Sequence, residues 1–203
     1  MKSTTYLEEL DYKLYYTKGA RFEAHDRLKH TAKLSMICSS LLNAYLIVAG
    51  LLSVYNIYST QFISGNLTAY LITSLSILLM VFNQVESVKQ YDKRGQGFLD
   101  CALELSSLYE ELRIFRTLQN QPTEAETIAF ARRIKTQYEQ VLKGTENHLP
   151  IDYDLYRSKK ARQLGLSFTQ LIQVRLKNYL SAYFFYHLLI GSPVLVGMVV
   201  WWM

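Results

Sequence analysis

One long segment without charge constrains this chain more than any other feature. Residues 34–85, between Lys33 and Glu86, contain no Asp, Glu, Lys, Arg or His, although the chain holds 22 Lys and Arg and 17 Asp and Glu in all. The hydrocarbon core of a bilayer is about 30 Å thick, so a spanning helix needs roughly 20 apolar residues. The segment therefore predicts two membrane spans and a short connection.

The boundaries of this hairpin follow from the positions of polar and aromatic residues. We expect spans over residues 34–58 and 70–85, joined by residues 59–69, which contain the turn-forming letters Ser64-Gly65-Asn66. A second apolar segment, residues 178–203, has His187 as its only ionisable side chain and predicts a third span. The predicted fold class is an all-α membrane protein with a two-transmembrane hairpin and a C-terminal transmembrane helix.

The remaining segments, residues 1–33 and 86–177, are charged and show helical periodicity. In the second of them we expect a helix through residue 115, a capping box at Thr123 and Glu126, a stop at Gly144, a loop over residues 145–154 and a last helix that breaks near Gly165. Apolar faces on these helices need a partner, and a second copy of the chain is one candidate, which makes a homo-oligomer an expectation. The faces consist of Phe98, Ala102, Leu105, Tyr109 and Leu112, and of Ile128, Ala131, Ile134, Tyr138 and Val141.

The placement of charge predicts the orientation in the membrane. Basic residues flank the hairpin on both sides, whereas its connection has none, so both flanks and the N-terminus should be cytoplasmic in a multi-pass protein of the cell inner membrane. The net charge of +5 is spread over a solvated face, and we expect no nucleic-acid partner. Cys38 and Cys101 form no pair motif, so a reducing cytoplasm suits both and no disulfide is expected.

Signatures of catalysis and of cofactor binding do not occur in the sequence. There is no phosphate-binding glycine loop, no zinc-ligand spacing and no nucleophile elbow, so we predict a non-enzymatic protein without cofactor or metal. His25 and His30 lie five residues apart, on different faces of a helix. His148 lies beside acidic residues in a predicted loop. A hydrogen-bonding role is a simpler interpretation of it than metal binding or acid–base chemistry.

Two uncharged polar stripes on the predicted hairpin are the candidate site. Such stripes can line a water path, or they can hold membrane helices together by close approach and by hydrogen bonds of about 0.6 kcal/mol each. The residue types favour packing over a pore, although one surface can serve both in an oligomer. Glu86, at the inner end, is expected to pair with a neighbouring basic residue. The stripes consist of Ser39, Asn43, Gly50 and Ser53 in the first span, and of Thr73, Ser76, Asn83 and Ser87 in the second.

In the third predicted span His187 shares a helix face with Tyr183 and Gly191. An ionisable side chain at membrane depth is a candidate functional residue. A neutral histidine bonded to Ser or Tyr is the alternative. Pro193 is expected to kink this helix.

The order of these elements resembles the SLATT family of two-transmembrane effector domains. The resemblance covers residues 5–177. It rests on Ala20-Arg21-Phe22 and Arg27 before the hairpin, on Tyr91, Arg94 and Phe98 after it, and on the loop from Asn147 to Tyr153. The family is found beside nucleotide-second-messenger and reverse-transcriptase defence genes of prokaryotes. The resemblance implies a membrane-perturbing effector of anti-phage defence that a cytosolic partner holds inactive, and it carries no active-site residues.

Three functions remain open at this stage. The first is a pore-forming effector that is triggered by a partner and causes abortive infection through loss of membrane integrity. The second is a non-enzymatic anchor or scaffold that holds a cytosolic partner at the lipid bilayer. The third, a small transporter or lipid-handling enzyme, lacks an intramembrane carboxylate and a catalytic cluster.

Overall fold

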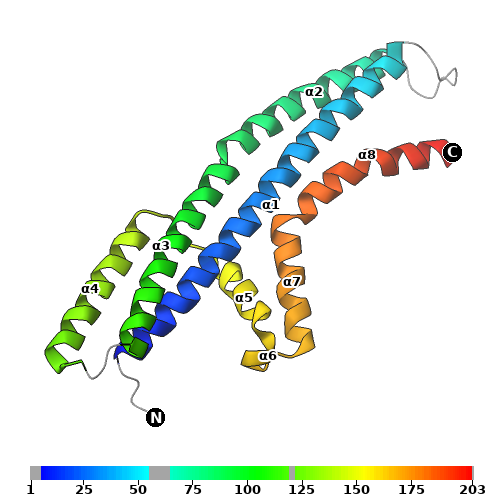
Figure 1. The fold of residues 1–203 in the computed structure, drawn as a ribbon. Helices are drawn as coiled ribbons and strands as arrows, with labels where there is room; N and C mark the ends of the chain where they lie inside the picture. Colours follow the sequence, from blue (N-terminus) through cyan, green and yellow to red (C-terminus); the bar gives the residue numbers. More distant parts are fainter. Residues whose placement is uncertain (1–5, 55–64, 119–121, 203) are drawn as a thin grey trace. The chain divides into compact units, whose positions relative to one another are not determined.

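In the computed structural model, which describes residues 6–54, 65–118 and 122–202, every element is an α-helix (Figure 1). This confirms the predicted all-α class. The chain divides into two compact units: the first contains residues 1–29 and 92–178, and the second contains residues 30–91 and 179–203. The helices are α1 Tyr6–Val54, α2 Gly65–Val88, α3 Tyr91–Leu118, α4 Glu124–Lys143, α5 Pro150–Lys159, α6 Ala161–Leu164, α7 Phe168–Ala182 and α8 Phe184–Trp202.

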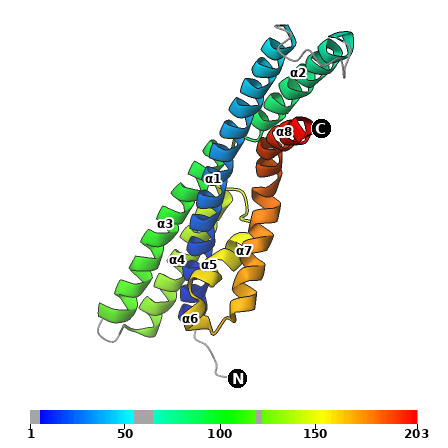
Figure 2. The same ribbon diagram turned by 90° about the vertical axis from the view of Figure 1, so that its right-hand side faces the viewer.

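The first unit is built on a core of three helices. The N-terminal part of α1 lies beside α3, and α4 folds back along them (Figures 1 and 2). The predicted apolar face of α3 is buried here, because Leu105 and Leu112 pack against Leu10 and Leu14 of α1 and against Ile134 of α4. One chain thus covers the α3 face, for which a second copy was one candidate partner, so this face does not argue for self-assembly. Periodicity shows that a helix face is buried, but it does not identify the element that covers it.

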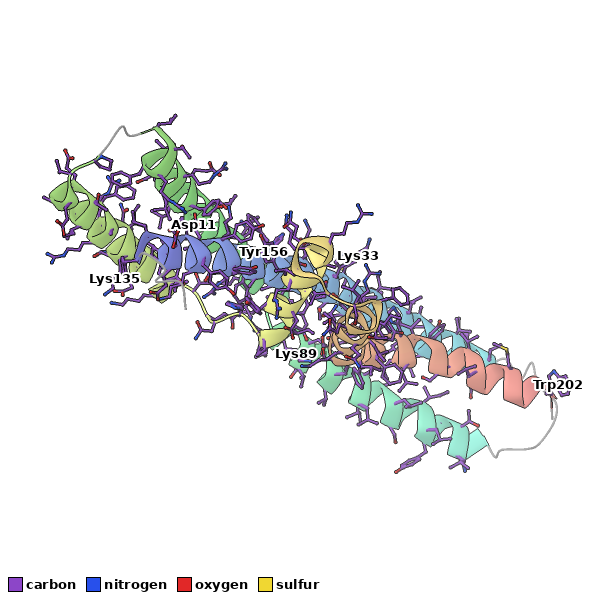
Figure 3. All side chains as sticks on the ribbon, turned by 90° about the horizontal axis from the view of Figure 1, so that it is seen from below. Asp11, Lys33, Lys89, Lys135, Tyr156 and Trp202 are labelled. Atoms are coloured by element: carbon purple, nitrogen blue, oxygen red, sulfur yellow. The ribbon has the colours of Figure 1, made fainter. Side chains whose placement is uncertain are left out.

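A cluster of tyrosines joins α1 to α5 in the same unit. Tyr156, labelled in Figure 3, packs edge-on against the rings of Tyr15 and Tyr16. A methyl group on Gly19 would lie only 2.4 Å from the Tyr156 ring, so this close approach explains a glycine inside a helix. The hydroxyls of Tyr153 and Tyr12 lie 3.2 Å apart, and that hydrogen bond, together with burial, raises the pKa of Tyr153 to about 12.

The capping residues predicted from the sequence are present at both ends of α4. Glu126 accepts from the backbone N–H of Thr123 at 2.9 Å, and the Thr123 hydroxyl accepts from Glu126 N–H at 3.3 Å, which completes the predicted capping box. These donors lower the pKa of Glu126. Gly144 is the C-terminal cap, as predicted, with right-handed backbone angles.

The predicted loop over residues 145–154 is too long. Helix α5 begins at Pro150, which fits the first helical position because proline lacks the N–H that would stay unpaired there. The Asp152 carboxylate accepts from the Leu149 backbone N–H at 2.9 Å and so stabilises the start of the helix. The predicted break at Gly165 is confirmed: its φ is +63°, and α7 begins at Phe168.

The second unit contains the hairpin, and here the structure corrects the predicted boundaries. Helix α1 runs without interruption from Tyr6 to Val54, so the predicted start of the first span lies inside one continuous helix. Helix α2 begins at Gly65 instead of residue 70, and its 24 residues extend about 36 Å, enough to cross a bilayer. The rest of the predicted connection and the end of the first span, residues 55–64, lie outside the described residues.

The ends of α2 and α8 complete the description of the second unit. Helix α2 continues through Glu86 and ends at Val88, and Gln90 has a φ of +45°, so α3 is a separate helix. Helix α8 has 19 residues and spans about 28 Å. The described residues thus include two helices long and apolar enough to cross a membrane, and one shorter apolar helix near the C-terminus.

Candidate functional site

A buried carboxylate links three helices of the second unit. Glu86, in the last turn of α2, is only 8% exposed. One carboxylate oxygen accepts hydrogen bonds from the Ser35 hydroxyl of α1 and from the Tyr186 hydroxyl of α8, each at 2.7 Å. The other oxygen accepts from the Lys89 ammonium at 2.5 Å. The predicted pairing of Glu86 with a neighbouring basic residue is therefore present.

Tyr186 extends this network and is itself 4% exposed. Its hydroxyl lies 3.0 Å from that of Tyr91, which can donate to it because the Tyr186 proton is directed at Glu86. A buried carboxylate needs a charge partner and additional donors, since leaving it unpaired would cost several kcal/mol. The sequence pointed to Glu86 and its basic neighbour but not to Ser35 or Tyr186. Their polar groups in otherwise apolar segments were the available signal.

Four of the predicted stripe residues lie together at one groove between α1 and α2. The groove has a volume of about 460 Å³ and is lined by Asn43 and Leu46 of α1 and by six residues of α2. Four of these six are polar, although the surrounding helix is apolar. They are Ser76, Asn83, Gln84 and Ser87, and the remaining two are Leu79 and Met80.

The hydrogen bonds of the stripes run along the helices. Asn43 donates to the Ser39 carbonyl at 2.7 Å, and the hydroxyls of Thr73, Ser76 and Ser87 donate to carbonyls three or four residues earlier in α2. In the described part of the chain the Asn83 side-chain oxygen is buried and has no hydrogen-bond partner. The groove therefore contains one polar atom that the described residues leave unsatisfied.

The other predicted site residues lie apart from this groove. Gly50, Ser53 and Thr73 are not among its lining residues, and Ser39 contributes through its carbonyl. His187 is exposed on α8, where its ring stacks on that of Tyr179 with 5.5 Å between centroids. Among the described residues His187 thus contacts a tyrosine rather than the Glu86 network.

The residues that carry the family resemblance come together in the first unit. Arg27 donates two hydrogen bonds, at 2.7 and 3.0 Å, to the fully buried carboxylate of Asp152. Arg94 makes the same two-pronged contact with Glu146, but on the exposed surface. Arg21 is 1% exposed, lies over the Phe98 ring and donates to the Glu146 carbonyl. These contacts attach the chain after α4 to α1 and to α3.

The two histidines of α1 and His148 take separate roles. His25 donates from Nδ1 to the Gly95 carbonyl at 2.9 Å, and His30 lies edge-on to Tyr183, so they do not share a site. Nδ1 of His148 is buried without a hydrogen-bond partner within the part of the chain described, so the expected bond is not made by this atom. Burial and the Arg21 charge lower the pKa of His148. Across residues 6–54, 65–118 and 122–202 no cluster of His, Cys, Asp or Glu could hold a metal ion. Cys38 and Cys101 are buried free thiols.

Comparison with known families agrees with this architecture. The chain belongs to the SMODS and SLOG-associating 2TM effector domain family 5, whose pattern matches residues 3–199. The resemblance inferred from the sequence is therefore confirmed over nearly the whole chain. The family consists of membrane effectors of defence systems, and its name records association with SMODS and SLOG partners. No curated protein and no solved structure matches the chain.

Proposed function

We propose that this member of the SLATT effectors opens a path for ions across the cell inner membrane when a cytosolic partner of the defence system signals infection. Family membership supports an effector that acts at a membrane. The observation that carries the finer proposal is the groove between α1 and α2, where polar side chains line about 460 Å³ in otherwise apolar helices.

The same groove supports assembly of several copies. Lipid chains cannot satisfy the Asn83 oxygen, which the described residues leave without a partner. A hydrogen-bond donor from another copy or a file of water can do so. Interhelical contacts of this kind stabilise membrane oligomers modestly, by about 0.6 kcal/mol per bond. Several copies that present this groove to one another would enclose a polar path.

The proposed orientation places the N-terminus and the first unit in the cytoplasm. Arg27, Lys29 and Lys33 precede the hairpin, whereas its connection has no charge. We expect a single cysteine at Asn147 to stay unlabelled by a membrane-impermeant maleimide in intact spheroplasts, and one at Asn66 to react. The native cysteines, Cys38 and Cys101, are buried and give a low background. Labelling at Asn147 but not at Asn66 contradicts the orientation.

Depolarisation of infected cells tests the proposed function. Cells that express the chain together with its neighbouring genes should lose membrane potential upon phage infection, as measured with a potential-sensitive dye. Asn83→Leu should slow this loss severalfold or more, because an apolar side chain in a narrow polar path promotes dewetting. Thr73→Val is the matched control: Thr73 lies on the same helix outside the groove lining, and its hydroxyl bonds only the Ala69 carbonyl among the described residues.

The alternative function is an anchor that holds a defence partner at the membrane. The hydroxyls of Thr73, Ser76 and Ser87 favour it, because each is satisfied within its own helix and needs no water. An anchor leaves the potential of infected cells intact. If neither Asn83→Leu nor Thr73→Val changes the depolarisation, the groove is not part of the proposed ion path.

A further inference from the structure

The C-terminal quarter of the chain carries basic residues but no acidic ones, and it also exposes a row of apolar side chains. Residues 155–203 contain no Asp or Glu but six basic residues: Arg157, Lys159, Lys160, Arg162, Arg175 and Lys177. Two of them are engaged within the first unit, since Lys159 pairs with Glu23 at 2.6 Å and Arg157 lies over the Tyr153 ring. Among the described residues no carboxylate pairs with Arg162, Arg175 or Lys177.

Helix α7 presents an apolar row to its surroundings. Phe168, Ile172 and Leu176 recur at steps of four, so they lie along one side of the helix, and they are 75, 48 and 52% exposed. Leu171 and Val174, on another side, are half-buried and attach the helix to the protein. The exposed row therefore remains uncovered after the helix has packed within its own chain.

We propose that α7 lies in the surface of the membrane and binds anionic phospholipid headgroups through Arg175 and Lys177, together with Arg162 of α6, while Phe168, Ile172 and Leu176 enter the acyl boundary. An exposed apolar row beside basic residues is the pattern of interfacial helices. The apolar helix α8 begins at Phe184, directly after α7 ends at Ala182, which keeps α7 close to a bilayer. A second copy of the chain is a poorer partner for this face, because two such faces would bring like-charged basic residues together.

Hydrogen exchange of the full-length chain in nanodiscs tests this proposal. Nanodiscs of phosphatidylcholine alone are compared with nanodiscs that also contain phosphatidylglycerol, each holding one copy of the chain. Backbone amides of residues 168–178 should exchange about tenfold more slowly with the anionic lipid, since each basic side chain near an anionic surface adds a severalfold gain in binding. Amides of α4 should not change. Screening by high salt should remove most of the difference.

Two matched double variants test whether the protection of residues 168–178 depends on the basic side chains of α7. Arg175→Gln/Lys177→Gln should abolish the difference between the two lipids, whereas Arg132→Gln/Lys143→Gln, which removes two exposed charges from α4, should retain it. Exchange in residues 168–178 that is independent of lipid charge overturns the proposal. Equal effects of both double variants also overturn it, as does protection that appears only when a nanodisc holds two copies. The proposal requires no pore and can hold if the chain is only an anchor.

Discussion

Arg27→Met is expected to destabilise the first unit by about 3–5 kcal/mol, because it leaves the Asp152 carboxylate buried without its charge partner. Asp152 is completely buried, and Arg27 supplies both of the hydrogen bonds at 2.7 and 3.0 Å that neutralise it. Its remaining contact, the Leu149 backbone N–H at 2.9 Å, is neutral. The expected loss is a large fraction of the stability of an ordinary domain.

The control for this prediction has the same geometry at the surface. Arg94 contacts Glu146 with 2.7 and 3.0 Å bonds, but both side chains are more than 40% exposed, so Arg94→Met should cost less than about 1 kcal/mol. Thermal unfolding of both variants in detergent, followed by circular dichroism, gives the comparison. Equal shifts in the two midpoints would show that burial does not strengthen the Arg27 pair.

Glu86→Ala is expected to loosen the attachment of α8 to the hairpin, by about 2–4 kcal/mol. The substitution removes the acceptor of two 2.7 Å bonds: the buried Ser35 hydroxyl loses this partner, and the Tyr186 hydroxyl keeps its 3.0 Å contact with the Tyr91 hydroxyl. The ring centroids of Phe82 in α2 and Phe185 in α8 lie 6.5 Å apart. A cysteine pair at these two positions should therefore cross-link with a short bismaleimide, and Glu86→Ala should reduce the yield severalfold.

Two further variants delimit the cause of this effect. Tyr186→Phe should reduce the yield less, because it removes the bonds to Glu86 and Tyr91 but leaves the carboxylate with its Ser35 and Lys89 contacts. Ser87→Ala should leave the yield unchanged, since the Ser87 hydroxyl bonds the Gln84 carbonyl of its own helix. An undiminished yield in the Glu86→Ala protein would mean that apolar packing alone attaches α8.

Features of the fold that depend on local sequence were predictable. The charge-free run predicts the membrane helices because the bilayer imposes a length and an apolar composition. Thr123 with Glu126 predicts the start of α4, and Gly165 predicts the break before α7, because capping and left-handed backbone angles depend on a few neighbouring residues. The predicted connection was too long where helix α2 begins, at Gly65 instead of residue 70.

Features that depend on distant partners were not predictable. Ser35 and Tyr186 are far apart in the sequence and meet only because α1 and α8 both pack against the end of α2. Likewise, the apolar face of Leu105 and Leu112 required a partner, but periodicity could not distinguish α1 of the same chain from a second copy. Four stripe residues line one groove because α1 and α2 are neighbours. Whether that groove contains water is a property of the assembled membrane protein.

Ion flux through reconstituted protein tests the central claim most directly. Full-length protein is incorporated together with its cognate defence partner into liposomes that hold a potassium gradient and a potential-sensitive dye, and extract from phage-infected cells supplies the signal. The account predicts rapid loss of the potential with infected extract, little loss with extract of uninfected cells, and a severalfold slower loss for Asn83→Leu than for Thr73→Val. A potential that persists with infected extract, in liposomes shown to contain both proteins, would contradict an ion-conducting effector and leave the membrane anchor.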